Sequence, residues 1–206
     1  MGDIPHFLLS ENIMENSLVN LVFGLVYFLL FVGRTYFKLL SNSFFDSYKG
    51  LEPKWLIVYR SVIGTILIIF TFLYITRRVP DFLILDLPAE FFYFGILVAI
   101  FSLFLIFWAH VKLGKGYSPS VGKTIKLVKD GPYAYIRHPM YVGYILLFFA
   151  TFLFTGWWLF FVLGELIMLS LVVWRLKIEE SILENRFGDE YKDYSKKVKR
   201  FIPFVF

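Results

Sequence analysis

The sequence predicts an all-α, polytopic membrane protein with five transmembrane helices and a C-terminal cytoplasmic helical segment. Of its 206 residues, 58% are hydrophobic, whereas soluble domains average roughly 45–50% apolar residues. Several apolar runs are long enough to cross a bilayer, and the Lys and Arg residues gather on one predicted side of it. The sequence contains no internal repeat or low-complexity tract, so we expect one domain, residues 1–206.

Five apolar segments account for the predicted spans, because a transmembrane helix needs about 20 consecutive apolar residues. Three of them stand alone. The other two come from one apolar block that is too long for a single span and is interrupted at Thr155-Gly156, which predicts a tight helical hairpin. The predicted spans are residues 17–40, 55–76, 91–111, 139–156 and 157–174.

The distribution of positive charge predicts the orientation of these spans. The first loop holds three Lys and Arg, the third loop six and the C-terminal tail eight, whereas the second loop holds two. Cytoplasmic loops are enriched in Lys and Arg, so we expect the N-terminus outside and the C-terminus in the cytoplasm. The membrane would be the plasma membrane of a prokaryote or the endoplasmic reticulum of a eukaryote. The net charge of +5 is therefore attributed to Lys and Arg on the cytoplasmic side of the membrane, and no nucleic-acid partner is expected.

The densest group of polar side chains follows a Gly-Pro turn, in the segment GPYAYIRHPMYVGY at residues 131–144. Pro139 is tolerated in the first turn of a helix, so a helix is expected to begin there. The free N–H groups of a helix start favour an anion, and Arg137 and His138 would reinforce this preference. Tyr and Arg are also common as anchors at the membrane surface, and both interpretations stay open on composition alone.

A second polar group lies in the tail WRLKIEESILENRFGDEYKDYSKKVKRFIP, directly after the last predicted span. Arg175 and Glu179 are four residues apart, so they share a helix face and can form an ion pair. An amphipathic helix on the membrane surface is the alternative. Adjacent carboxylates at Glu179 and Glu180 disfavour that alternative, because anionic lipids would repel them. A functional site is therefore slightly preferred.

Other features of the sequence limit the possible chemistry. The chain has no Cys and no His-x-x-His spacing, so no metal site is expected. The segment GKGYSPSVGKTIKLVKDG lacks a preceding strand and the second half of a dinucleotide-binding fingerprint. Glu165 lies within a predicted span, where a charge is costly, and a structural ion pair with Arg34 or Arg60 is the preferred explanation.

The two motifs together resemble the isoprenylcysteine carboxyl methyltransferase family of integral-membrane enzymes, which is related to the phospholipid methyltransferases. The resemblance covers roughly residues 105–203 and rests on the Arg-His-Pro-x-Tyr core, the Glu-Glu pair and the Phe-Gly-x-x-Tyr-x-x-Tyr run. It implies a site for S-adenosylmethionine that is closed by the cytoplasmic loop and tail. It also implies a lipidated or lipid-like methyl acceptor that enters from the membrane bilayer.

The resemblance also implies roles for individual residues. The family often has His at the position of Ile125, so the adenine end of the cofactor site differs in this chain. Arg175 would face the carboxylate of the acceptor. The implied cofactor contacts are Ile125, Lys126, Leu127, Val128, Tyr133, His138, Pro139, Met140, Tyr141 and Glu179.

The chemistry of S-adenosylmethionine fits these residue types. A buried carboxylate, Glu179, suits the ammonium group, whereas a helix start and His138 suit the carboxylate. The rings of Tyr133 and Tyr141 suit the sulfonium or the adenine. Methyl transfer needs mainly alignment, and a carboxylate acceptor needs no general base.

The preferred function is carboxyl O-methylation of an isoprenylcysteine-type substrate. Three alternatives stay open. The first is N- or S-methylation of a small lipid or amphiphile. The second is an NADPH-dependent membrane isoprenoid or sterol reductase, and the third is a non-enzymatic transporter or scaffold. A transporter is disfavoured because the polar residues gather at one face of the predicted membrane and not at mid-bilayer. The sequence does not identify the methyl acceptor.

Overall fold

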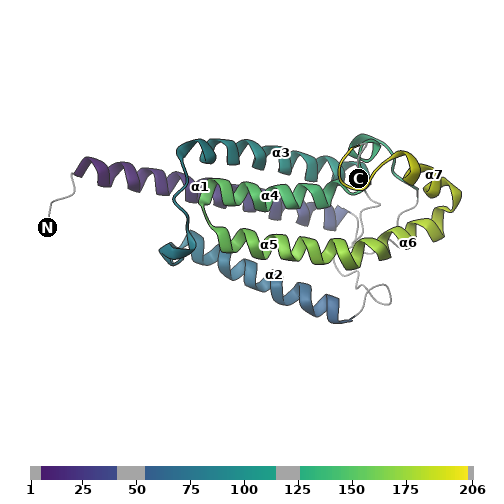
Figure 1. Cartoon of the computed structure of the whole chain (residues 1–206), viewed down its shortest axis with the longest axis horizontal. Coiled ribbons are helices and arrows are strands. Elements are labelled where there is room, and N and C mark those ends of the chain that lie inside the picture. The colour runs from purple at the N-terminus through teal and green to yellow at the C-terminus, as the bar shows by residue number, and fades with distance from the viewer. Residues whose placement is uncertain (1–5, 41–53, 115–125, 204–206) are drawn as a thin grey trace.

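The computed structural model describes residues 6–40, 54–114 and 126–203, and the side chains of residues 6–16, 56, 57 and 60 are outside this description. The described chain is all-α, as predicted, and its only β contacts are two isolated bridges. Figure 1 shows an elongated bundle with α6, α7 and the C-terminal segment at one end. The α-helices are α1 (His6–Leu40), α2 (Lys54–Ile75), α3 (Ala89–Leu113), α4 (Pro139–Thr155), α5 (Trp158–Ser170), α6 (Leu176–Phe187) and α7 (Asp189–Lys197). Short 3-10 turns cover Asp81–Leu83 and Gly131–Ala134, and a π turn covers Leu171–Arg175.

Close packing of α3 against α4 forms the centre of the bundle, and the two helices run side by side in Figure 1. Glycines make this approach possible. A Cβ at Gly95 of α3 would lie 2.8 Å from the backbone nitrogen of Phe154. A Cβ at Gly143 of α4 would lie 2.5 Å from Ile106. Small residues at helix interfaces are typical of membrane bundles, where close backbone contact supplies the attraction.

The predicted break at Thr155-Gly156 is confirmed. Helix α4 ends at Thr155, and Gly156 adopts a left-handed conformation with φ 69°. The backbone N–H of Leu85 donates to the carbonyl of Gly156 at 2.9 Å, and a side chain at Gly156 would collide with the backbone of Leu85. Glycine is therefore needed at this turn for both its conformation and its size.

After this turn the chain forms one continuous helix, Trp158–Phe187, from α5 through the π turn into α6. Its apolar part ends at Trp174, and its polar part carries Arg175, Glu179 and Glu180. The helix therefore extends beyond the apolar bundle and projects the second polar motif past its end (Figure 1).

An aromatic cluster attaches α1 and α2 to the rest of the bundle near the Gly156 turn. Trp157 is 1% exposed, and its ring stacks on Tyr74 of α2 with 5.2 Å between centroids. Phe23 of α1 lies 4.5 Å from Tyr74 and 5.9 Å from Phe160 of α5. These rings hold the first two helices at the end of the bundle opposite to α6 and α7.

Three helices are long and apolar enough to cross a membrane, namely Ser17–Leu40, Ala89–Leu113 and Trp158–Phe187. Two further apolar helices, Ser61–Ile75 and Pro139–Thr155, are shorter. Each predicted span thus coincides largely with a helix. The exposed outer surface of these helices is rich in Leu, Ile and Phe, as expected for contact with lipid.

Candidate active site

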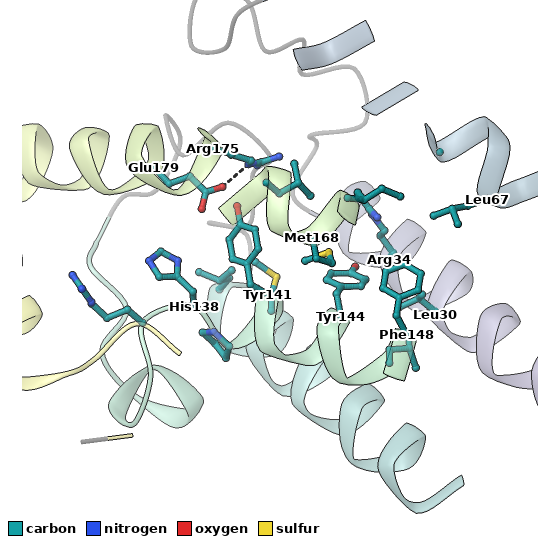
Figure 2. Close-up of a pocket in the computed structure, with 18 of the residues that line it drawn as sticks. Leu30, Arg34, Leu67, His138, Tyr141, Tyr144, Phe148, Met168, Arg175 and Glu179 are labelled. Carbon is teal, nitrogen blue, oxygen red and sulfur yellow. Dashed lines mark hydrogen bonds and ion pairs between the residues drawn. The ribbon is translucent and has the colours of Figure 1, made fainter. Parts of the chain in front are cut away.

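A cavity of about 790 Å³ lies between the helices, at the end where α4 begins and α6 projects. Its size is within the roughly 300–1,000 Å³ range of small-molecule sites. One end is formed by residues 127–128, the first turn of α4 and the start of α6. The other end is formed by α1, α2 and α5, and Figure 2 shows side chains from both ends.

Most of the site residues implied by the family resemblance line this cavity. Lys126 is exposed and is not part of the lining, and Ile125 lies outside the described residues. The predicted residues that the structure brings together around the cavity are Leu127, Val128, Tyr133, His138, Pro139, Met140, Tyr141, Arg175 and Glu179.

The first polar motif is shaped by its two prolines. The Gly131–Ala134 turn buries Pro132 and Tyr133, and it carries Pro132 in its first positions. Helix α4 then begins at Pro139 with His138 as its N-cap residue, as predicted. Pro is accepted there because the first N–H groups of a helix have no internal partner. The turn and the helix start place Tyr133, His138 and Tyr141 on one wall of the cavity.

The C-terminal segment is hydrogen-bonded to this motif, and the sequence did not reveal this contact. The backbone N–H of Arg137 donates to the carbonyl of Lys199 at 2.8 Å, and that of His138 donates to Arg200 at 3.1 Å. The hydroxyl of Tyr194 on α7 donates to the carbonyl of Tyr133 at 2.6 Å. The tail therefore covers the first polar motif through hydrogen bonds to the backbone of Tyr133, Arg137 and His138.

Glu180 is the central acid of this closure. Its carboxylate lies 2.6 Å from Arg200, 3.1 Å from Arg137 and 3.2 Å from Nε2 of His138, and its side chain is only 13% exposed. Burial alone would raise the pKa of Glu180, but the hydrogen bonds from His138 and Arg200 and the charge of Arg137 lower this pKa to about 2. Glu180 does not line the cavity. It joins α6, the start of α4 and the tail.

Glu179 faces a different direction from its neighbour. It lines the cavity, and its Oε1 accepts a hydrogen bond from Nε of Arg175 at 2.6 Å. The predicted i,i+4 ion pair is therefore confirmed. Both side chains are largely buried, and Figure 2 shows the pair above Tyr141 and His138. A partly buried carboxylate beside aromatic rings can receive an ammonium or another cation.

The two ends of the cavity differ in chemistry. The end at α4 and α6 carries the tyrosines, His138 and the Arg175–Glu179 pair. The other end, which we call the apolar arm, lies between α1, α2, α4 and α5. Phe31 and Ile68 line this arm and are also 68% and 72% exposed, so the arm reaches the outer surface of the bundle. The residues of the apolar arm are Leu30, Phe31, Gly64, Leu67, Ile68, Leu147, Phe148 and Phe160.

Sequence comparisons agree with the position of this site. Residues 91–190 match the phospholipid methyltransferase family. A protein-S-isoprenylcysteine O-methyltransferase of Schizosaccharomyces pombe is 37% identical over 101 residues, which cover 47% of this chain and 43% of that protein. The enzyme of the same name from Rattus norvegicus is 32% identical over 129 residues, covering 54% and 40%.

A relative with a different named substrate matches as well. Methanethiol S-methyltransferase 1 of Bradyrhizobium diazoefficiens is 34% identical over 92 residues, which cover 45% of this chain and 30% of that protein. The alignments thus span less than half of the length of each of these relatives. The predicted resemblance to these membrane methyltransferases is confirmed, and we call the matching residues 91–190 the family domain.

Proposed function

We propose that this protein is an S-adenosylmethionine-dependent methyltransferase that acts on a lipid-like acceptor at the cytoplasmic face of a membrane. The reaction that fits best is carboxyl O-methylation of an isoprenylcysteine-type substrate. The observation that carries this proposal is the two-ended cavity, in which a polar end built by the family domain continues into the apolar arm.

The polar end suits the methyl donor. Glu179 would hold the α-ammonium, and the first turn of α4 at Pro139 and Met140 would receive the α-carboxylate. An anion at a helix start is favoured by the free N–H groups and the helix dipole. Tyr133 and Tyr141 would offer aromatic faces to the cationic sulfonium. When bound, the donor supplies an electrophilic methyl group.

Arg175 would hold the reacting group of the acceptor. It lines the cavity and is fixed by Glu179, so one ion pair would connect the donor side to the acceptor side. The planar guanidinium can hold a carboxylate through two parallel hydrogen bonds. The wall around the transfer site is largely aromatic and apolar, which excludes water and helps a reaction in which opposite charges disappear.

The size and the lining of the cavity distinguish between the acceptors named for the relatives. A volume of about 790 Å³ greatly exceeds what a small thiol such as methanethiol needs beside the donor. An amine acceptor would be repelled by Arg175 and would need a base to remove a proton. A long-chain carboxylic acid uses both the cation and the apolar arm.

The membrane arrangement belongs to the same proposal. Five spans, with the N-terminus outside, would place residues 112–138 and the segment after residue 174 in the cytoplasm. The donor would then enter from water, whereas the acceptor would enter from the bilayer. The position of the cavity at the end of the apolar bundle supports this arrangement.

The proposal is tested by incubating the detergent-solubilised protein with methyl-labelled S-adenosylmethionine and a synthetic S-farnesylcysteine. Carboxyl methylation gives an ester, which alkali hydrolyses to labelled methanol. An alkali-stable product would indicate N- or S-methylation instead. If S-farnesylcysteine stays unlabelled but a membrane lipid extract is labelled, the protein is a methyltransferase with a different class of acceptor.

A further inference from the structure

We propose that Phe148 of α4, which packs on Gly164 of α5, sets the depth of the apolar arm and thereby the chain length of the methyl acceptor. The depth matches S-farnesylcysteine, whose chain has three isoprene units, better than an analogue with two or four units. This inference rests on the proposed function, and it adds a specificity-determining residue to the proposed acceptor site.

The apolar arm has a closed end, formed by Phe148 and Phe160. Both rings line the arm, are only 9% and 1% exposed, and have centroids 5.8 Å apart. Phe154 and Trp157 lie further from the polar end along α4 and α5. They belong to the same buried cluster but do not line the cavity. A chain that extends along the arm from the polar end therefore meets a wall of aromatic rings.

Tyr27 of α1 holds the closed end together. Its ring packs edge-on against Phe160, with 5.7 Å between the ring centroids, and its hydroxyl lies 2.9 Å from Oγ1 of Thr151 on α4. The hydroxyl of Thr151 in turn donates to the carbonyl of Leu147 at 2.8 Å. These contacts fix the wall, and a chain-length limit requires a fixed wall, because a wall that moves would admit longer chains.

Gly164 determines where the ring of Phe148 lies. A Cβ at Gly164 would collide with this ring, so the ring occupies the space that a larger residue on α5 would take. Any side chain at position 164 would push the ring away from α5 and into the cavity that the ring lines. The apolar arm would then be shorter.

The length of the arm follows from helix geometry. Arg175, which we propose holds the acceptor carboxylate, comes eleven residues after Gly164, so the two residues are about 16 Å apart along the helix axis. The guanidinium of Arg175 points toward Glu179, further from the closed end, which adds to the available length. Figure 2 shows Phe148 further along α4 than Tyr144, away from the Arg175–Glu179 pair.

The acceptor can be compared with this length. An extended chain gains about 1.2 Å per bond, so S-farnesylcysteine, with about 15 bonds from the carboxyl carbon to the last main-chain carbon, is about 18 Å long. The geranyl and geranylgeranyl analogues, with about 11 and about 19 bonds, are about 13 Å and about 23 Å long. The farnesyl chain therefore reaches the closed end, whereas the geranyl chain stops short of it. The geranylgeranyl chain has to bend, and Phe31 and Ile68 mark where it could leave the arm.

The test uses the full-length protein in detergent, with Phe148→Ala and Gly164→Ala. Phe149→Ala is the control for the first variant, because Phe149 is the next residue of α4, is 37% exposed and does not line the cavity. Gly24→Ala is the control for the second, because a Cβ at Gly24 meets no atom within 4 Å and Gly24 does not line the cavity.

Two quantities are measured for the geranyl, farnesyl and geranylgeranyl derivatives of cysteine at equal mole fractions in the micelles. The first is kcat/KM for methyl transfer. The second is displacement of a labelled S-farnesylcysteine, which requires no methyl transfer. Ratios between chain lengths within one preparation do not depend on how much of a variant is folded, so a loss of stability does not imitate the effect.

For the wild-type protein, we expect kcat/KM to be highest for the farnesyl derivative. In Phe148→Ala, the geranylgeranyl-to-farnesyl ratio should rise by about tenfold, an effect that a small change in the size of an apolar pocket can have. In Gly164→Ala, the geranyl-to-farnesyl ratio should rise by about the same factor. Phe149→Ala and Gly24→Ala should keep the wild-type ratios.

Equal shifts in Phe148→Ala and Phe149→Ala would overturn the chain-length role, and so would a wild-type optimum at the geranylgeranyl derivative. If displacement shows the expected shifts but no analogue is methylated, the chain-length role stands and the proposed reaction fails. If the analogues are methylated with the same ratios in every variant, the proposed reaction stands and the inference fails.

Discussion

The two walls of the cavity come from different parts of the chain and differ in how they are held. The wall built by residues 91–190 is fixed by a dense set of polar contacts. They include the contacts of Glu180 with two arginines and His138, and the backbone hydrogen bonds from Arg137 and His138 to the tail. The wall built by α1 and α2 is apolar except for Arg34, Ser61, Thr71 and Tyr27, and it is attached through aromatic rings near Trp157.

This difference suggests that the two walls bind different ligands. The family domain would supply the donor site, which every member using the same donor needs. The first two helices would shape the space for the acceptor. Relatives named for isoprenylcysteine and for methanethiol align with this chain over 101 and 92 residues, respectively.

The largest effect is expected for Glu180→Ala, on the polar wall. The substitution leaves Arg137 and Arg200 without their shared carboxylate, and breaking a buried ion pair typically costs about 3–5 kcal/mol. We expect a clearly lower thermal unfolding midpoint in detergent and loss of donor binding. Glu184→Ala is the matched control on α6, because Glu184 is exposed and lies 4.0 Å from Lys192. Similar midpoints for the two variants would show that Glu180 does not hold the tail.

Arg175 lies where the two walls meet, and Arg175→Lys should impair use of the acceptor while leaving cofactor binding nearly unchanged. Lys cannot reproduce the two-bond hold on a carboxylate, so turnover of S-farnesylcysteine should fall by about 100-fold. The affinity for S-adenosylhomocysteine should stay within a few-fold, as measured by titration. Unchanged turnover, or loss of cofactor binding, would exclude Arg175 as the residue that holds the reacting carboxylate.

A smaller and complementary effect is expected for Glu179→Gln. Removing the charge that we propose faces the donor ammonium should weaken S-adenosylhomocysteine binding by about 10- to 100-fold, the typical cost of a lost charge-assisted hydrogen bond. The shape of the side chain is kept, so the unfolding midpoint should barely change. Full cofactor affinity in this variant would mean that the ammonium binds elsewhere.

The smallest effect is expected on the apolar wall, for Gly64→Phe in α2. A Cβ at Gly64 meets no atom within 4 Å, so the protein should tolerate the ring, which would project toward the apolar arm. The KM should rise several-fold for S-farnesylcysteine but not for a short-chain analogue. Gly24→Phe is the matched control, because Gly24 also has open space around it and does not line the cavity. Equal KM changes for both chain lengths would exclude this route for the acceptor chain.

The sequence predicted the fold well because the signals were local. Apolar runs indicated the helices, Gly156 indicated the hairpin turn, and Pro139 indicated the start of α4. The i,i+4 spacing also predicted the Arg175–Glu179 pair. Each of these features depends on residues within one or two turns of each other.

The contacts that the sequence did not reveal join distant segments. The sequence implies a role for Glu179 and none for Glu180, because nothing in the local spacing brings Arg137 and Arg200 to Glu180. The pairing of Glu165 with Arg34 or Arg60 stays a prediction. That Arg34 lines the cavity depends on the packing of α1 against α4, which local spacing does not predict. Apart from Arg175, the residues proposed for the acceptor side lie outside the two polar motifs, so they could be found only from the cavity.

The central claim is that the polar wall binds S-adenosylmethionine, and calorimetric titration of the detergent-solubilised protein with S-adenosylhomocysteine tests it most directly. We predict saturable binding that weakens in Glu179→Gln and is unchanged in Gly64→Phe. Saturable binding of NADPH together with no binding of S-adenosylhomocysteine would contradict the account and favour a reductase.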